Sequence, residues 1–310
     1  MIAIFNSTLP IFLLMIIGAI IKRYWLTSDE FWRGTEKLSY FLLFPCALFS
    51  YIASADLKNN QILHVIGLLI LASSILSAGL IIYKKKSGIG AKVFTSIFQG
   101  SVRYNNYMFF GIGSALYKET GLSMIAIIAL YLIVFTNIIS ILTFNIFLEK
   151  EKDSDYFNRL FNLIKKFTLN PMIFASLIAL IFNKFEIKID GSLNSLLQNL
   201  SNSALTMGII TIGSALKLSI KNIAQLKLIF ITVINKLIIM PIITCILFYV
   251  FHVEGMVREI GILYSCLPCA TTSYILSKQL GGDADLMASI ITFETIFSIF
   301  SLSFLMYLLL

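Results

Sequence analysis

Apolar residues along this chain form ten runs, each long enough to cross a membrane, with short polar segments between them. The runs lie near residues 4–21, 38–55, 62–83, 93–116, 122–147, 168–183, 196–216, 228–251, 259–277 and 286–310. A helix that crosses a hydrocarbon core of roughly 30 Å needs about 20 predominantly apolar residues. The pattern therefore predicts an all-α integral membrane protein with ten transmembrane helices.

The composition supports the same prediction. Only 13% of the 310 residues are charged and 58% are hydrophobic, whereas about 25% of the residues in a soluble domain are charged. The chain has too few polar side chains to cover a water-facing surface, so a lipid bilayer is its expected partner. The net charge of +8 comes mainly from short loops between apolar runs, a placement that sets membrane topology and argues against nucleic-acid binding.

The basic residues gather in alternate loops. If the loops are assigned to two sides in turn, one side receives 17 Lys and Arg residues and the other receives 5, while Arg103 and Lys236 fall inside apolar runs. Because basic loops stay in the cytoplasm, this asymmetry predicts a multi-pass plasma-membrane protein with both termini outside the cytoplasm. Lys22 and Arg23 follow the first run. This is the reverse of a signal peptide's charge order, so the run is expected to remain as a span.

Two halves of the chain resemble each other. Thr8-Leu9-Pro10 opens the first run as Thr168-Leu169-Asn170-Pro171 opens the sixth, and residues 135–141 of the fifth run match residues 293–299 of the tenth at nearly the same separation. Residues 1–147 thus form one predicted repeat and 168–310 the other, joined by a charged cytoplasmic linker at 148–167. Five spans per repeat means that the halves insert with opposite orientation, a plan typical of secondary transporters.

Polar and helix-breaking residues interrupt the fourth and ninth runs, which occupy equivalent positions in the two halves. The fourth run contains Gln99, Arg103, Asn105 and Asn106, followed by Gly111 and Gly113, and the ninth contains Pro268, Thr271, Thr272 and Ser273. Glycine and proline weaken a helix, and unwound backbone inside a membrane exposes amide and carbonyl groups that can replace the water around a solute. We therefore expect helix breaks at Gly111, Gly113 and Pro268, and a binding site beside them.

Three charges lie inside the predicted spans. Arg103 is costly at this depth, and it either contacts an anion or extends its side chain to the cytoplasmic interface. Glu294 and Lys236 lie at similar predicted depths, which permits an ion pair. The pair is either a proton-responsive coupling element or a permanent structural one, and Asn137 is grouped with it because its repeat-mate segment carries Glu294.

The sequence predicts no catalytic, metal or cofactor site. The four cysteines all lie in apolar runs, and Cys266-Leu-Pro-Cys269 has no βαβ context that would indicate redox chemistry. Nucleophile elbows, phosphate loops and metal-ligand spacings do not occur in the sequence. An enzyme is therefore not expected.

Four segments carry a resemblance to a known family. They are Lys37–Pro45, Gln99–Gly111 with its Arg-x-Asn-Asn core, Asn170-Pro171, and Leu267-Pro268 followed by Gly281–Asp283. Here the sequence resembles the auxin efflux carrier family, which includes plant PIN-type carriers and bacterial malate and malonate permeases. The resemblance covers nearly the whole chain.

The resemblance implies a five-plus-five inverted repeat on the plan of bile acid/sodium symporters and NhaA-type antiporters, with helices 4 and 9 broken and crossing. It implies a scaffold from spans 1, 2, 6 and 7 and a transport domain from spans 3–5 and 8–10. It also implies elevator-type transport of an organic anion, often by a homodimer. Asn105, Asn106 and Pro268 are the positions carried over from the family.

Two departures from the family pattern affect these expectations. Gly111 and Gly113 stand where family members carry proline, and the third span offers only serines where PIN-type members have an acidic residue. The sequence thus predicts a secondary transporter for a small mono- or dicarboxylate such as malate or malonate, or for an auxin-like acid, with a proton or sodium as coupling ion. The alternatives are a cation/proton antiporter-type carrier, a sodium-coupled symporter of the same plan, and a non-transporting receptor.

Overall fold

The computed structural model describes residues 2–55, 60–148, 171–216 and 222–309. All the regular secondary structure in these ranges is helical, as predicted. The helices are α1 (Ile2–Tyr24), α2 (Asp29–Leu38), η1 (Ser39–Leu43), α3 (Phe44–Ala53), α4 (Asn60–Ser87), α5 (Ala91–Val102), α6 (Asn106–Leu148), α8 (Pro171–Lys184), α9 (Gly191–Ala215), α10 (Ile223–Ile234), η2 (Asn235–Ile239), α11 (Met240–Val250), α12 (Gly255–Cys266), α13 (Thr272–Leu280) and α14 (Ala284–Leu309). The predicted linker beyond Leu148 and the Asn170 of the repeat motif lie outside the described residues.

Several helical stretches are apolar and long enough to cross a bilayer. Within the described ranges these are Gln61–Ser87, Ala91–Leu148, Ile223–Val250 and Ala284–Leu309, and Pro171–Lys184 is a shorter apolar helix. Large apolar side chains also point outward from the fold, for example Phe174, Ile246 and Phe300. An apolar exterior of this kind suits lipid, and the chain is a multi-pass membrane protein. The ten-span inverted repeat stays a prediction.

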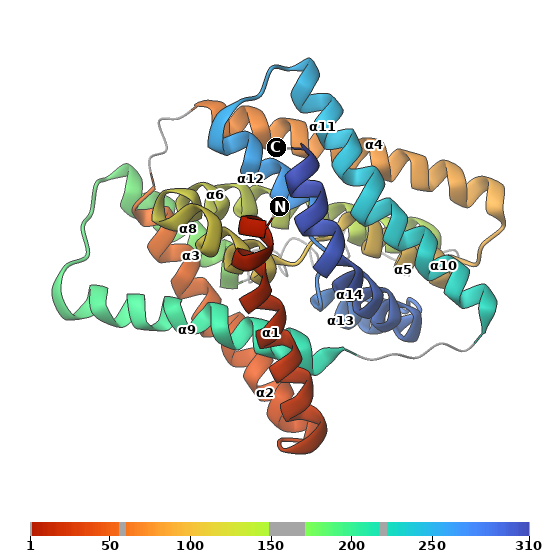
Figure 1. Ribbon diagram of the computed structural model, residues 1–310, viewed down its shortest axis with the longest axis horizontal. Coiled ribbons are helices and arrows are strands. Elements are labelled where there is room, and N and C mark those ends of the chain that lie inside the picture. Colours follow the sequence, from red (N-terminus) through yellow and green to blue (C-terminus); the bar gives the residue numbers. More distant parts are fainter. Residues whose placement is uncertain (1, 56–59, 149–170, 217–221, 310) are drawn as a thin grey trace, which may run out of the picture.

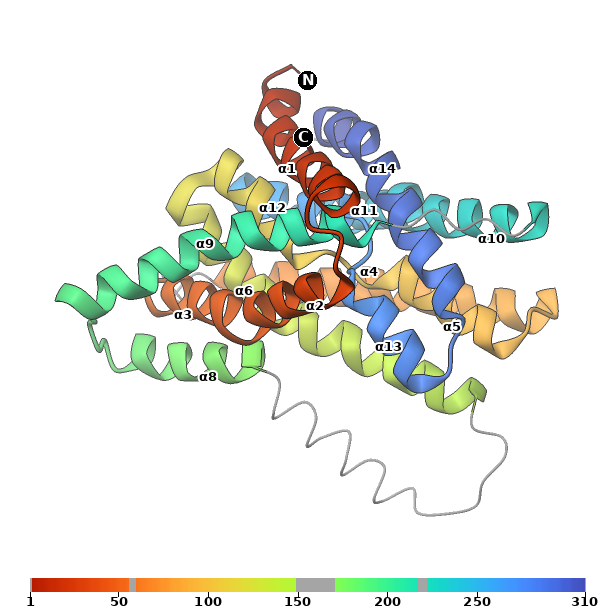
Figure 2. The same ribbon diagram turned by 90° about the horizontal axis from the view of Figure 1, so that it is seen from below.

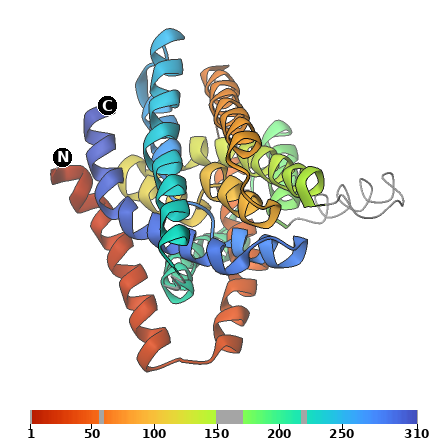
Figure 3. The ribbon, with the colours of Figure 1, turned by 90° about the vertical axis from the view of Figure 1, so that its right-hand side faces the viewer.

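The helices gather into two packed groups. Figure 2 shows α3, α8 and α9 on the left and α5, α10 and α13 on the right. Helix α1 packs along α9, and α3 packs against both α8 and α9. On the other side, α14 contacts α5, α10 and α12, and α4 contacts α11 and α12. Helices α1 and α14 lie side by side where the groups meet (Figure 1), and both chain ends lie on the same side of the molecule (Figure 3).

Glycine allows α1 and α9 to approach very closely. A Cβ atom added at Gly18 would lie 2.0 Å from the carbonyl oxygen of Ile210, and one at Gly213 would lie 1.8 Å from that of Met15. Contacts this short leave room for hydrogen only. Small residues with this role are typical of helix pairs in membranes, where close backbone packing supplies much of the association energy.

Proline changes the helical hydrogen bonding in two places. Pro45 and Pro241 each follow the first residue of an α-helix, and a π-helical segment precedes each of them. Proline has no N–H and its ring clashes with the preceding turn, so the ladder widens locally. The amide of Phe44 bonds the carbonyl of Ser39 in η1, and the amide of Met240 bonds that of Asn235 in η2. The second segment carries Lys236.

The two polar runs are interrupted helices. Helix α5 ends at Val102 and α6 begins at Asn106, while α12 ends at Cys266 and α13 begins at Thr272. The second interruption contains Pro268, as predicted.

The first interruption differs from the prediction. Gly111 and Gly113 lie in helical backbone inside α6, and the break precedes them at residues 103–105. Their role is packing, because a Cβ at Gly111 would lie 2.8 Å from Ile209 and one at Gly113 would lie 2.1 Å from Ile125. Farther along α6, Lys118 has a φ of 53° and kinks the helix between the two segments predicted as spans 4 and 5.

Candidate functional site

The two helix interruptions touch each other. The amide of Asn105 donates a hydrogen bond of 2.9 Å to the carbonyl of Pro268. Arg103 and Leu267, the residues that follow α5 and α12, both have extended backbone, with ψ of 157° and 145°. Each break thus satisfies part of the other's exposed backbone, as buried polar groups require. We call the residues of both breaks, 103–105 and 267–271, the crossing.

Arg103 is a buried cation at the crossing with neutral partners. Its guanidinium donates to Gln99 Oε1 at 3.2 Å, Asn137 Oδ1 at 2.9 Å and Thr272 Oγ1 at 3.2 Å, and the residue is only 8% exposed. Gln99 is itself fixed by donating to Ser277 Oγ at 2.9 Å. Among the described residues, no carboxylate lies within ion-pair distance of Arg103. The snorkelling alternative does not fit a buried guanidinium.

Two asparagines at the start of α6 keep unpaired polar atoms. Asn105 Oδ1 accepts from the amide of Met108 at 3.2 Å and caps the helix. Its Nδ2 has no acceptor within the described part of the chain, although the residue is 1% exposed. Asn106 is half-buried, and its Oδ1 likewise has no donor there. Buried polar atoms without partners are rare, and at a solute site they are groups that a ligand can satisfy.

Glu294 is tied to the second break. Its Oε2 accepts a 2.8 Å hydrogen bond from the backbone amide of Cys269, while its Oε1 has no partner in the described ranges. Lys236 is fully buried, and its Nζ lies 5.6 Å from the ring centre of Tyr264 without a described hydrogen-bond partner. The two charges lie close enough to interact electrostatically. The ion pair that their similar predicted depth permitted is not formed, because no Lys236–Glu294 contact falls within 4.0 Å.

The remaining predicted residues divide between the two charged groups. Asn137, which sequence reasoning grouped with Glu294, bonds Arg103 instead. Thr271 and Thr272 are half-buried at the start of α13. Ser273 is buried, and its Oγ lies 3.2 Å from the thiol of Cys269.

Sequence reasoning missed two contributors, and we find no sequence signal that would have revealed them. Ser277 supports Gln99. Cys269 supplies the amide that bonds Glu294, and its thiol lies 3.4 Å from the carbonyl of Gln99. Cys269 therefore contacts both halves of the chain, whereas the sequence predicted no chemical role for it.

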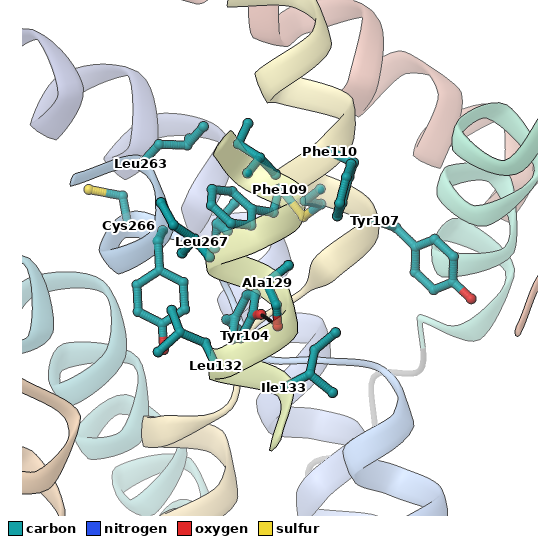
Figure 4. Close-up of a cluster of buried hydrophobic side chains, with 14 of the residues drawn as sticks. Tyr104, Tyr107, Phe109, Phe110, Ala129, Leu132, Ile133, Leu263, Cys266 and Leu267 are labelled. Atoms are coloured by element: carbon teal, nitrogen blue, oxygen red, sulfur yellow. Dashed lines mark hydrogen bonds between the residues drawn. The ribbon is translucent and has the colours of Figure 1, made fainter. Parts of the chain in front are cut away.

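Aromatic side chains pack tightly around the first break. Tyr104 is 2% exposed, and its hydroxyl donates to the carbonyl of Ala129 at 3.3 Å (Figure 4). Its ring centre lies 4.5 Å from that of Tyr264 and 5.9 Å from that of Phe109. This packing holds the unwound segment against the second half of α6, so the break is a fixed feature of the fold.

A large cavity lies apart from the crossing. It measures about 1500 Å³ and is lined by α1, α3, α6, α8 and α9 together with the segment after α8. Polar residues line much of it, including Asn183, Asn194, Gln198 and Asn202. Of the predicted site residues only Gly111 reaches it. The cavity therefore lies between the α1–α3–α8–α9 group and the first half of α6.

Comparison with known proteins identifies the family. A search of curated proteins finds no match to the chain. A family model described as membrane transport protein, which represents the auxin efflux carriers, matches residues 3–306. The match spans both interrupted helices and nearly the whole sequence, and so the chain belongs to the auxin efflux carrier family of membrane transport proteins.

Proposed function

We propose that this transporter moves a small organic anion and that the anion binds at the crossing. The observation that carries the proposal is Arg103, a buried guanidinium with three neutral acceptors. Burying a charge is costly unless an opposite charge compensates it. A carboxylate that arrives from solution supplies that charge, and the planar guanidinium suits bidentate contact with it.

The groups around Arg103 also favour an anion. Asn105 Nδ2 is an unpaired donor, and the Thr272 hydroxyl already lies within bonding distance of Arg103. Helices α6 and α13 both begin at the crossing, so the positive ends of their dipoles face it. Thr271 and Ser273 belong to the same helix start. The donor set therefore suits a mono- or dicarboxylate such as malate or malonate, or an auxin-like acid.

The packing suits an elevator-type movement. Helices α1, α3, α8 and α9, which correspond to spans 1, 2, 6 and 7, are joined by extensive α1–α9, α3–α8 and α3–α9 packing, while α6 contacts both this group and helices α4, α5 and α12. The cavity of about 1500 Å³ lies at the boundary between the groups. In this proposal the first group is the scaffold, contributes the homodimer contact, and stays still while the second carries the crossing across the bilayer.

Glu294 and Lys236 form the coupling element of the proposal, with a proton as the coupling ion. A permanent buried pair is expected to be in direct contact with its remaining atoms satisfied. Here Glu294 Oε1 and Lys236 Nζ both lack described partners, with the thiols of Cys266 and Cys269 and the Tyr264 hydroxyl as neighbouring titratable groups. Because Glu294 holds the Cys269 amide beside Pro268, a proton gained or lost there acts on the crossing.

Substitution at Asn105 tests the binding site. Asn105→Ala is expected to abolish counterflow of labelled carboxylates in proteoliposomes without lowering expression. Asn105→Asp is the sharper variant, because it keeps the acceptor that caps α6 but replaces the unpaired donor with an acceptor. It should fold normally and lose uptake.

Asn199→Ala, on an exposed position of α9, is the matched control and should transport normally. Undiminished uptake by both Asn105 variants would place the solute elsewhere. Binding without movement into sealed vesicles would indicate a receptor, and solute-independent proton flux after a pH jump would indicate a cation/proton antiporter.

A further inference from the structure

A second, smaller cavity lies between the two helix groups, where α1 and α14 meet. It measures about 310 Å³ and is formed by α1, α14 and Leu216 at the end of α9. Its walls are mostly apolar and include Phe12 and Ala19 of α1 and Ile299 of α14. Arg23, in the last turn of α1, lines the same groove and is the one charged side chain among the described residues that form it. Helices α1 and α14 contact each other, and Figure 3 shows them side by side near the chain ends and diverging toward the end of α1.

The α1 wall of the groove has the length of one membrane leaflet. Phe12 and Arg23 are separated by eleven residues of continuous helix, which corresponds to about 16 Å at the α-helical rise. One leaflet contributes half of a hydrocarbon core of roughly 30 Å. An acyl chain that starts at the level of Arg23 therefore reaches the level of Phe12 near the bilayer centre.

Aromatic residues place Arg23 at the headgroup level. Tyr24 and Trp25 are 72% and 76% exposed, and exposed aromatic residues at a helix end are typical of the membrane–water interface. The Arg23 guanidinium carbon lies 5.4 Å from the Tyr24 ring centre. The neighbouring cation, Lys22, is engaged by Asp29 and by the carbonyl of Thr27. Arg23 has no described carboxylate partner of this kind, so it is available to an external phosphate.

We propose that this groove binds an anionic phospholipid, with one acyl chain between α1 and α14 and the headgroup phosphate on Arg23. A lipid that covers an ordinary apolar helix surface does not require a cation. In this groove, an apolar channel of leaflet length ends at a cation at headgroup depth. The lipid touches one helix from each packed group, and Thr295, next to Glu294, lies in the groove wall. Occupancy therefore depends on the relative position of the two groups. The site stands on its own contacts and does not require the proposed solute.

The two tryptophans of the chain, Trp25 and Trp32, provide the assay. In a Trp32→Phe background, quenching of Trp25 is measured in nanodiscs that contain brominated phosphatidylglycerol or brominated phosphatidylcholine. Phosphatidylglycerol should be preferred about fivefold, since one basic residue near an anionic headgroup contributes about 1 kcal/mol. Arg23→Gln removes the charge and Ala19→Phe fills the channel, and each should abolish the preference. The ranking is checked in the native background by mass spectrometry of phospholipid retained on the purified protein.

Arg33→Gln is the matched control, because it removes an exposed cation of α2 on the same side of the fold without touching the groove. It should leave the preference intact. Equal loss in Arg33→Gln and Arg23→Gln would show diffuse surface electrostatics and overturn the site. A wild-type protein without preference, or an Ala19→Phe variant that keeps it, would also overturn the proposal. None of these readouts uses the transported solute, so they are independent of the function proposed above.

Discussion

Replacement of Arg103 by glutamine is the most informative perturbation of the crossing. Glutamine keeps a polar side chain but removes the charge and the planar fork. In the structure the guanidinium donates to Gln99, Asn137 and Thr272 at 2.9–3.2 Å. All three acceptors are neutral, so no ion pair inside the protein is broken by the change. The charge that loses its partner is the one on the bound solute.

The magnitude follows from that arrangement. A unit charge about 4 Å away contributes roughly 4 kcal/mol at an effective dielectric constant of about 20, and a charged hydrogen bond contributes about 1.5–3 kcal/mol. We therefore expect Arg103→Gln to weaken solute binding by about 2–4 kcal/mol, which corresponds to roughly 30- to 1,000-fold. The unfolding temperature of the Arg103→Gln protein should change by only a few degrees. Loss of the three hydrogen bonds destabilises the fold, but removal of a poorly compensated buried charge stabilises it by a similar amount.

Binding of a labelled dicarboxylate to purified protein, measured beside thermal unfolding, separates these effects. Arg103→Lys keeps the charge but not the fork, and should bind with intermediate affinity. Lys85→Gln removes an exposed charge at the end of α4 and should match the wild type. Unchanged affinity in a folded Arg103→Gln protein would refute the anion-binding role. Unfolding of that variant would show that Arg103 is structural.

Three further changes test the fold and the coupling element. Gly18→Ala would bring a Cβ to 2.0 Å from the Ile210 carbonyl oxygen, so overpacking of roughly 1–3 kcal/mol should lower the unfolding temperature, whereas Gly34→Ala, with open space around it, should not. Burial raises the pKa of the Glu36 carboxyl in α2 above its ordinary value, so the folded protein keeps that proton to higher pH than the unfolded chain and wild-type stability falls as the pH rises through this interval. Glu36→Gln should thus equal the wild type in unfolding temperature near pH 4 and exceed it at about pH 8, and a constant difference would contradict this assignment. Glu294→Gln keeps an acceptor for the backbone amide of the second break, so uptake should persist but lose its pH dependence, and an unchanged pH profile would assign Glu294 a purely structural role.

The sequence located the important segments but not their internal geometry. Proline identified the second break correctly, because it has no N–H and its ring clashes with the preceding turn, although Pro10 lies within the continuous helix α1. The glycines predicted the wrong position for the first break, since Gly111 and Gly113 serve close packing against neighbouring helices. The break lies instead at Arg103–Asn105, where Asn105 caps the next helix and bonds the backbone of the other half.

The sequence pattern could not predict which side chains of different helices contact each other. Depth along a helix can be counted from residue numbers, and Glu294 and Lys236 were placed at similar depth on that basis. Their separation depends on helix rotation and on the π-helical segment that carries Lys236, and they make no direct ion pair. The same limit explains why Asn137 was assigned to Glu294 although it bonds Arg103.

The central claim is that a carboxylate binds where the two interrupted helices meet. A density map of the protein in lipid with a saturating dicarboxylate tests it directly. The account predicts solute density in contact with the Arg103 guanidinium and the Asn105 side chain, beside the bond between Asn105 and Pro268. Solute density confined to the large cavity by α8 and α9, with the crossing empty, would contradict it.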